Sequence, residues 1–336
     1  MRIAQIAPPF ESIPPAQYGG TERVVSMLTE ELVRRGHDVT LFASGDSTTA
    51  ARHIPTVDTA LWREPDAGND LMYWTITIGE AYRRAAWGEF DVIHAHLDFL
   101  TFPCAELVGT PTVTTLHGRL DLPGLRSVFA RFPHQAVISI SDSQRAPLPD
   151  ARWVATVYNA VDVPALQFSP EPGDYLAFLG RITPDKGLDR AIRIARMVGL
   201  PLRVAARKPL RGTDAPQDRA DWDYYRTVIR PLLREPGVEF VGEVGDADKS
   251  AFLGPARALL FPIDWPEPFG LVMAEALACG TPVVARRRGS VPEVVEPGVT
   301  GWVGETDEDL ARACENLDSI DRAECRAAAE RRFHPG

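Results

Sequence analysis

Short apolar runs that alternate with segments of helical spacing are the feature that most constrains the fold of this chain. Between the first two runs, apolar residues recur at helical spacing from position 21 to 35, and the pattern stops at Gly36. Runs and helical segments in this alternation predict a parallel sheet with helices on both faces. In the first half the predicted strands are 2–7, 37–43, 91–94, 112–116 and 136–140.

The second half of the chain repeats this alternation, so we expect two α/β domains. A length of 336 residues fits two domains of about 150 residues each. Several prolines indicate a linker at 163–173, which leaves a first domain at 1–162 and a second at 174–320. The polar segment 207–221 is expected to be a mobile loop or a lid. The predicted strands here are 175–179, 202–206, 238–241 and 258–261, and a helix is predicted at 188–197.

The segment 265–275 carries the most chemical information. Pro268 places Glu267 in the loop that enters a helix, and residues 269–272 are expected to form the first turn of that helix. Unpaired N–H groups and the helix dipole make such a turn suited to a phosphate. Glu275 lies about one turn further in.

Two cations follow the predicted strand 175–179. Arg181 and Lys186 can supply the positive charge that a diphosphate needs. Carboxylates such as Glu267 and Glu275 suit sugar hydroxyls better than they suit the phosphate itself. The joint pattern therefore indicates a site for a nucleotide sugar.

Motifs along the whole chain resemble retaining glycosyltransferases of the GT-B fold, family 4. The resemblance runs from residue 2 to about residue 333. It implies two Rossmann-like parallel-sheet domains that face a cleft, with 321–336 beginning a terminal helix that returns toward the first domain. It extends to transferases that tailor oligosaccharide antibiotics such as avilamycin. The matching segments are Gly19–Glu22, Asp91–His96, Thr115–Gly118, Val157–Asp162, Gly180–Arg181, Lys186–Gly187, Glu267–Glu275, Ala278–Val284 and Gly289–Gly298.

The resemblance also assigns roles to the matching residues. It implies that Arg181 and Lys186 bind the donor diphosphate, that Glu275 binds the ribose and that Glu267 contacts hydroxyls of the donor sugar. His117 is expected near the same sugar, where it can orient a hydroxyl. The catalytic set implied is thus His117, Arg181, Lys186 and Glu267. The remaining donor-binding residues implied are Gly19, Gly20, Val244, Phe269, Gly270, Leu271 and Val272.

Each of these assignments has a plainer alternative. Arg181 can pair with a surface carboxylate, Lys186 can be a turn residue, and His117 can be structural. The two glutamates can instead act as an acid and a nucleophile, as in retaining glycosidases, which need carboxyl groups about 5 Å apart. If the residues between Glu267 and Glu275 were all helical, eight steps would span roughly 12 Å. Anchoring of ribose and sugar therefore fits the spacing better.

Two further residues of the first half are candidate acceptor contacts, namely Asp98 and Arg119. His94 and His96 alternate on a predicted strand, so both point to one face, and that spacing can bind a metal. No third ligand clearly completes such a site. We therefore expect no metal and no other cofactor, since arginine and lysine serve the diphosphate.

Composition argues against several other classes of protein. A net charge of −10 disfavours a nucleic-acid footprint and strong docking to anionic membranes. No apolar run approaches the length of about 20 residues that spans a membrane, so stable membrane insertion is not expected. The first residues do not resemble a signal peptide, and a cytoplasmic location is expected. The four cysteines show no metal or redox spacing.

These observations lead to an expected activity. We expect metal-independent, retaining transfer of a hexose or pentose from a nucleotide diphosphate to a hydroxyl of a saccharide or natural-product acceptor. A UDP-sugar is the favoured donor and a GDP-sugar the second choice, and the protein is expected to be a monomer or homodimer. The rivals are a nucleotide-sugar epimerase of similar fold and a binding module without turnover. A pyridoxal-phosphate phosphorylase is disfavoured, because only Lys186, Lys208 and Lys249 could form its Schiff base.

Overall fold

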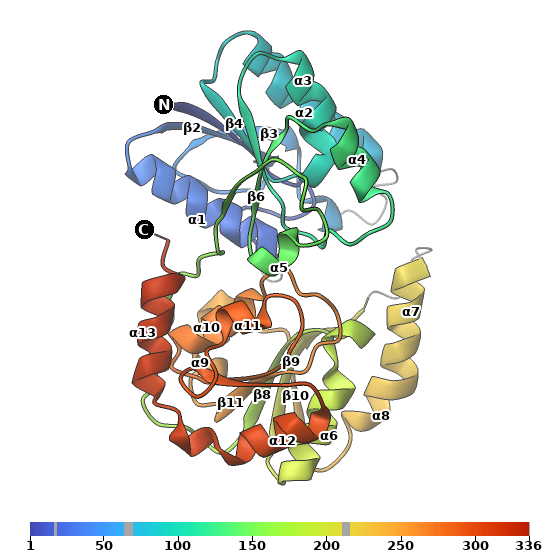
Figure 1. Cartoon of the computed structure of the whole chain (residues 1–336), viewed down its shortest axis with the longest axis vertical. Helices are drawn as coiled ribbons and strands as arrows, with labels where there is room; N and C mark the ends of the chain where they lie inside the picture. Colours follow the sequence, from blue (N-terminus) through green and yellow to red (C-terminus); the bar gives the residue numbers. More distant parts are fainter. Residues whose placement is uncertain (17–18, 64–69, 210–215, 336) are drawn as a thin grey trace. The chain divides into compact units, whose positions relative to one another are not determined.

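The chain forms two compact α/β units. The computed structural model describes residues 1–16, 19–63, 70–209 and 216–335 (Figure 1). Met1–Asn159, together with Pro335, makes up the first unit, and Ala160–His334 makes up the second. The segment 163–173 falls in the second unit, where the side chains of Val163 and Leu166 are buried.

The first unit is built on a seven-stranded sheet in which every strand pairing is parallel. The strand order is β3-β2-β1-β4-β5-β6-β7. Parallel neighbours need crossover connections, and the helices between the strands supply them. The strands are β1 (Arg2–Ile6), β2 (Asp38–Ser44), β3 (Arg52–Val57), β4 (Val92–Ala95), β5 (Thr112–Thr115), β6 (Ala136–Ser139) and β7 (Trp153–Thr156).

Helices cover both faces of this sheet (Figure 1). In β2, Leu41 packs in a cluster with Val25 of α1, whereas the next residue, Phe42, packs in a cluster with Ile78 and Tyr82 of α2. Because successive side chains of a strand point to opposite faces, α1 and α2 lie on opposite faces. The helices are α1 (Gly20–Arg34), α2 (Asp70–Ala86), α3 (Phe102–Leu107), α4 (Leu125–Arg131) and α5 (Asp142–Arg145), with 3₁₀ turns η1 (Leu61–Arg63) and η2 (Asp98–Thr101).

The second unit is built on a six-stranded parallel sheet with the order β10-β9-β8-β11-β12-β13. Its strands are β8 (Leu176–Arg181), β9 (Leu202–Arg207), β10 (Val238–Gly242), β11 (Ala258–Phe261), β12 (Val283–Arg286) and β13 (Gly301–Gly304). Its longer helices are α6 (Leu188–Val198), α7 (Pro216–Tyr224), α9 (Asp246–Leu253), α10 (Leu271–Ala278), α12 (Asp307–Glu315) and α13 (Arg322–Arg332). Its short elements are η3 (Val163–Ala165), η4 (Pro184–Lys186), a π-helical turn η5 (Tyr225–Ile229), α8 (Arg230–Leu232), α11 (Val291–Val294) and η6 (Leu317–Ser319).

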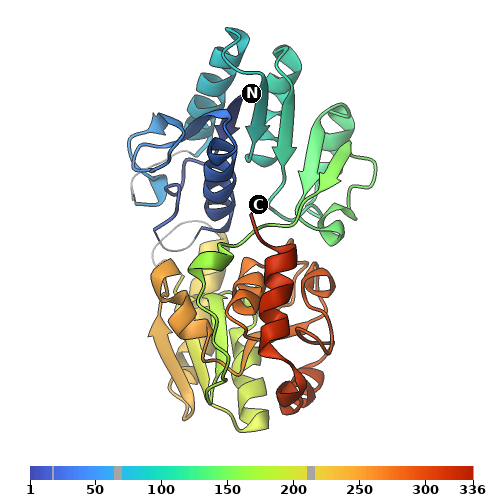
Figure 2. The same ribbon diagram turned by 90° about the vertical axis from the view of Figure 1, so that its left-hand side faces the viewer.

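The core of the second unit explains where its helices lie. Helices α6 and α12 share one apolar cluster with β8, β9 and β11. Helix α13, red in Figure 2, packs on α10. The rings of Phe269 and Phe333 meet edge to face at the ends of this packing, 5.7 Å apart between centroids. Phe333, which follows α13, therefore supports the segment that leads into α10.

The prediction of two parallel-sheet α/β domains is confirmed, and two local expectations need correction. The sequence predicts a mobile loop or a lid at 207–221, but α7 begins at Pro216, because proline suits the first turn of a helix and Asp218 favours its dipole. Residues 210–215 lie outside the described residues. Four strands, β3, β7, β12 and β13, were also not predicted; Pro55 in β3 is compatible with the place of this strand at the sheet edge. Among the described residues, no helix is both long and apolar enough to cross a membrane.

Candidate functional site

The topology of the second unit brings three loops to one edge of its sheet. Strand β8 pairs with β11, and β11 pairs with β12, all in parallel. The carboxyl ends of these neighbours lie at the same edge, which is where ligands bind in open α/β sheets. The loop after β8 is tied directly to the loop after β11, since the amide of Asp264 donates to the carbonyl of Asp185 at 2.8 Å. Residues far apart in the sequence therefore meet here.

Lys186 and Glu267 form the centre of this edge. The ammonium Nζ of Lys186 lies 2.5 Å from Oε2 of Glu267, and the two side chains are 13% and 10% exposed. The indole of Trp265 donates to the same oxygen at 3.1 Å, and its ring lies 4.5 Å from the ammonium. An ammonium has three N–H donors, so Lys186 keeps donors for a ligand anion beside Glu267.

Two glycines allow the loops to come this close. Gly187 has a φ of +71°, and a Cβ there would lie 2.5 Å from the carbonyl oxygen of Pro262. Gly289 has a φ of +53°, and a Cβ there would lie 2.3 Å from the backbone nitrogen and oxygen of Glu267. The amide of Ser290 donates to that same carbonyl at 2.9 Å. The loop after β12 thus fixes the backbone from which Glu267 projects.

Helix α10 starts two residues later than the sequence predicts. Leu271 and Val272 are its first residues, whereas Gly270 is the N-cap with a φ of +79° and Phe269 precedes the helix. The left-handed conformation of Gly270 is not helical, so residues 269 and 270 lie before the helix and not in its predicted first turn. The Phe269 side chain is buried, and its carbonyl accepts a hydrogen bond from Ser290 Oγ at 2.8 Å.

Glu275 has a partner that the sequence analysis did not single out. Its Oε1 lies 2.5 Å from Nζ of Lys249, which also contacts Asp246 at 2.8 Å. Lys249 and Glu275 are among the buried charged residues, 6% and 7% exposed. The scarcity of lysine could have drawn attention to Lys249, because it is one of only three lysines in the sequence. No sequence pattern predicts that α9 packs against α10.

The remaining predicted residues of the second unit lie at the same sheet edge or near it. Arg181 is the last residue of β8 and pairs in register with Arg207 of β9. Val244 is half-buried in the loop between β10 and α9. The second unit thus assembles Arg181, Lys186, Glu267 and the start of α10 around loops that all follow parallel strands.

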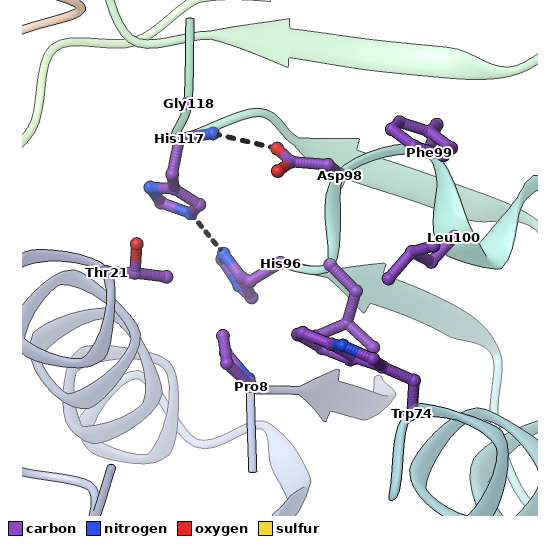
Figure 3. Close-up of a pocket in the computed structure, with 10 residues that line it drawn as sticks. Pro8, Thr21, Trp74, His96, Asp98, Phe99, Leu100, His117 and Gly118 are labelled. Atoms are coloured by element: carbon purple, nitrogen blue, oxygen red, sulfur yellow. Dashed lines mark hydrogen bonds between the residues drawn. The ribbon is translucent and has the colours of Figure 1, made fainter. Parts of the chain in front are cut away.

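The first unit holds a pocket of about 330 Å³ at the carboxyl ends of β4 and β5 (Figure 3). His117 and Asp98, both predicted as site residues, line it. Asp98 has a φ of +48°, a conformation that non-glycine residues rarely adopt, and its Oδ1 accepts the amide of His117 at 3.4 Å. Burial raises the pKa of the Asp98 carboxyl, against the lowering effect of the His117 and Gly118 amides. The pocket is lined by Pro8, Thr21, Trp74, His96, Leu97, Asp98, Phe99, Leu100, His117 and Gly118.

Three histidines gather beside this pocket. The rings of His94 and His96 are 4.3 Å apart, and those of His96 and His117 are 5.2 Å apart. Burial lowers the pKa of His94 to about 4, and burial with the neighbouring His94 lowers the pKa of His117 to about 3. The pKa of His96 lies well below its ordinary value for the same reasons. All three rings are therefore neutral at pH 7.

The other predicted residues of the first unit are placed differently. Gly19 is the N-cap of α1 and Gly20 its first residue, and a Cβ on Gly19 would lie 2.7 Å from Pro15. Arg119 is not among the residues that line the pocket, and its guanidinium makes two hydrogen bonds of 2.7 Å to Asp121. Within the described part of the chain, no group of three or more His, Cys, Asp or Glu could hold a metal ion.

Family models match both halves of the chain. Residues 165–332 match the model of glycosyl transferases group 1, and residues 18–164 match that of glycosyltransferase family 4. A glycogen synthase of Mycobacterium tuberculosis is 29% identical over 354 residues, covering 90% of this chain and 81% of that protein. A phosphatidyl-myo-inositol mannosyltransferase of Mycolicibacterium smegmatis is 29% identical over 336 residues, covering 92% of this chain and 82% of that protein.

Solved structures share the fold. AviGT4, a glycosyltransferase involved in avilamycin A biosynthesis, has a TM-score of 0.72 at 23% identity, over 99% of this chain and 93% of that one. HepE of Anabaena, in complex with UDP and glucose, has a TM-score of 0.73 at 20% identity, over 100% of this chain and 96% of that one. These likenesses confirm the predicted GT-B architecture of two Rossmann-like parallel-sheet domains.

Proposed function

Since this chain belongs to the glycosyltransferases of group 1 and family 4, we propose that it is a retaining, metal-independent enzyme that uses a nucleotide-sugar donor. A UDP-sugar is the favoured donor and a GDP-sugar the second choice. The acceptor is a hydroxyl of a saccharide or of a natural product that carries one. We also propose that the reaction takes place in the cytoplasm.

The observation that carries this proposal is the surroundings of Lys186. A buried ammonium beside Glu267 lies in the loop after β8, and α10 begins in the segment after β11. When the bond to the anomeric carbon breaks, the leaving diphosphate gains negative charge. Cations held in a site of low dielectric stabilise that charge more in the transition state than in the ground state. Arg181 and the first amides of α10 add donors for the same phosphates.

The carboxylates have separate tasks in this proposal. Glu267 accepts hydrogen bonds from hydroxyls of the donor sugar, and Glu275, fixed by Lys249, accepts them from the ribose. No side chain is assigned as the enzymic base. The donor phosphate takes the proton of the acceptor hydroxyl as the new bond forms on the face that the phosphate leaves, so the anomeric configuration is retained.

Calorimetric titration tests the donor site first. UDP, GDP and ADP are added without metal to the wild-type protein and to Lys186→Ala. Tight binding of one nucleotide, weakened in the variant, is the expected result, whereas equal affinity in both proteins contradicts the assignment of Lys186. Repeating the titration with magnesium tests metal independence.

A panel of acceptors then tests the rest of the proposal. The names of the relatives suggest a glucan, D-inositol 3-phosphate and phosphatidyl-myo-inositol as members. Saccharide precursors of oligosaccharide antibiotics complete the panel. The anomeric proton of any product, followed by NMR during the reaction, distinguishes retention from inversion.

A further inference from the structure

A chain of three hydrogen-bonded side chains leads from the buried sheet of the first unit to its pocket. The amide Oε1 of Gln5 in β1 lies 2.8 Å from Nε2 of His96, which follows β4. The Nδ1 of His96 lies 2.9 Å from Nε2 of His117, which follows β5 (Figure 3). Gln5 is fully buried and His96 is 3% exposed. The strands β1, β4 and β5 are neighbours in the sheet, so the three hydrogen-bonded side chains lie in a row across it.

The chemistry of these groups determines which atom donates and which accepts in each of the two hydrogen bonds. In the orientation that the structure gives the Gln5 amide, the oxygen faces His96 and the buried Nε2 of Gln5 has no hydrogen-bond partner among the described residues. An amide oxygen can only accept a hydrogen bond, so in this orientation His96 donates from Nε2. A neutral imidazole has one N–H, and Nδ1 of His96 therefore carries a lone pair. That lone pair accepts the hydrogen bond that Nε2 of His117 donates. Since His117 is also neutral at pH 7, its Nδ1 is left as an acceptor.

The remaining nitrogen of His117 is available to a ligand. Figure 3 shows Nδ1 on the side of the ring away from His96, and His117 lines the pocket. Among the described residues, this ring makes a hydrogen bond through Nε2 and none through Nδ1. The backbone of the same residue is held by Asp98. The ring is thus oriented from two directions and presents a lone pair.

The hydrogen-bond acceptors that line the pocket, Nδ1 of His117 and the Asp98 carboxylate, bear on the chemistry of the ligand. Two hydrogen-bond acceptors repel a phosphate oxygen and attract hydroxyl groups, which can donate. We propose that Gln5 and His96 are positioning residues that fix His117 as its Nε2–H tautomer, so that Nδ1 accepts a hydrogen bond from a sugar hydroxyl. This inference rests on the proposed function for the identity of the ligand, but the tautomer itself does not depend on it.

Nitrogen NMR of the histidine side chains tests the tautomers directly. Long-range proton–nitrogen spectra of labelled protein at pH 7, assigned with single histidine variants, distinguish a protonated ring nitrogen from one with a lone pair. We expect a lone pair on Nδ1 of both His96 and His117. A proton on either Nδ1, or an imidazolium in either ring, overturns the proposal.

Two variants and a matched control separate positioning from packing. In Gln5→Met and His96→Phe, which keep the apolar volume, the His117 spectrum is expected to shift toward a mixture of tautomers. His94→Phe removes a ring whose Nε2 instead faces Thr115 Oγ1 at 2.7 Å, and it should leave the His117 tautomer unchanged. An unchanged His117 tautomer in folded His96→Phe overturns the proposal.

Added ligands connect the tautomer to the sugar. UDP-glucose is expected to shift the Nδ1 resonance of His117, whereas UDP alone is not. In His96→Phe, turnover of UDP-glucose should fall about tenfold, while the affinity for UDP should stay unchanged. A Nδ1 that responds equally to both ligands overturns the assignment to a sugar hydroxyl. If the tautomers are as expected but no nucleotide binds in calorimetry, the proposed function is wrong, and the positioning of His117 by Gln5 and His96 is still supported.

Discussion

Lys186 and Glu267, 81 positions apart in the chain, meet as a nearly buried ion pair with an Nζ–Oε2 distance of 2.5 Å. Each is the other's counterion, so neither can be removed without leaving a poorly solvated charge. Any ligand phosphate that binds Lys186 must share it with Glu267. The pair therefore affects stability and binding together, and experiments must separate the two.

Replacement of Lys186 by alanine is expected to weaken binding of the donor nucleotide by about 2 kcal/mol, roughly thirtyfold, because a charge-assisted hydrogen bond to phosphate is lost. It should also lower the free energy of unfolding, since Glu267 is left without its cation. Calorimetry measures the first effect and urea unfolding measures the second.

The double variant Lys186→Ala with Glu267→Gln is the control for this experiment. The neutral amide needs no counterion, so stability should recover while nucleotide affinity stays low. Recovery of affinity along with stability would show that Lys186 acts only through the fold.

The buried pair of Lys249 and Glu275 offers a second test, now of stability. Lys249→Met leaves the Glu275 carboxylate buried without its cation, and we expect unfolding to become easier by about 3 kcal/mol. Adding Glu275→Gln should restore most of this loss, because the isolated charge is gone. A double-mutant cycle from urea unfolding gives the coupling energy.

Lys208 supplies the matched control for that cycle. Its side chain is exposed, with the ammonium 4.9 Å from the Phe240 ring, so Lys208→Met should change stability by less than about 1 kcal/mol. Equal losses in Lys249→Met and Lys208→Met would contradict the role given to the buried pair.

Periodicity was sufficient to predict β1, β2, β4–β6 and β8–β11, because a buried parallel strand is a short apolar run whatever its surroundings. It did not predict β3, β7, β12 or β13. Adjacent strands then bring Lys186 and Glu267 to one sheet edge, as the rule for ligands at strand ends requires. The partner of Glu275 could not be predicted in this way. Lys249 and Glu275 belong to two helices, and their packing depends on side-chain fit that no local pattern encodes.

The start of α10 shows a second limit of sequence reasoning. Gly270 can adopt either helical or left-handed backbone conformations, and the sequence alone does not choose between them. The surroundings leave room only for a glycine in this conformation, since a Cβ at Gly270 would lie 2.7 Å from the Met273 side chain and 3.3 Å from the ring of Phe261 in β11. The role of His96 was missed for a similar reason, because its partner Gln5 lies on β1 and its partner His117 follows β5.

The three neutral histidines predict a specific dependence of stability on pH. Their folded pKa values lie below the ordinary 6.5, at about 4 for His94 and about 3 for His117. Between pH 6.5 and 4 the unfolded chain therefore binds more protons than the folded protein. The free energy of unfolding should fall as the pH falls, by about 1 kcal/mol per pH unit for each histidine.

Carboxyl groups also contribute near this window, since burial raises the pKa of Glu22 and of Asp98, and variants identify the contribution of each group. Glu31, whose pKa is about 2, binds its proton in the folded protein only below the window. Asp98, whose pKa is raised by burial, acts in the opposite sense, so Asp98→Asn should steepen the slope. His96→Phe should reduce the slope of unfolding free energy against pH by the equivalent of about one bound proton. An unchanged slope in urea unfolding between pH 5 and 7 would rule out a neutral His96 as its source.

The contact between Gly289 and the backbone of Glu267 gives the last prediction. At a φ of +53°, a Cβ would lie 2.3 Å from both the nitrogen and the oxygen of Glu267, so Gly289→Ala must displace the loop that carries this carboxylate. We expect a loss of about 3 kcal/mol in unfolding free energy and weaker binding of the nucleotide sugar. Gly79→Ala is the matched control, because this glycine lies in α2 with nothing within 4 Å of its Cβ position, and the change should stabilise by about 0.5–1 kcal/mol. Equal behaviour of the two variants in urea unfolding would mean that the loop after β12 does not position Glu267.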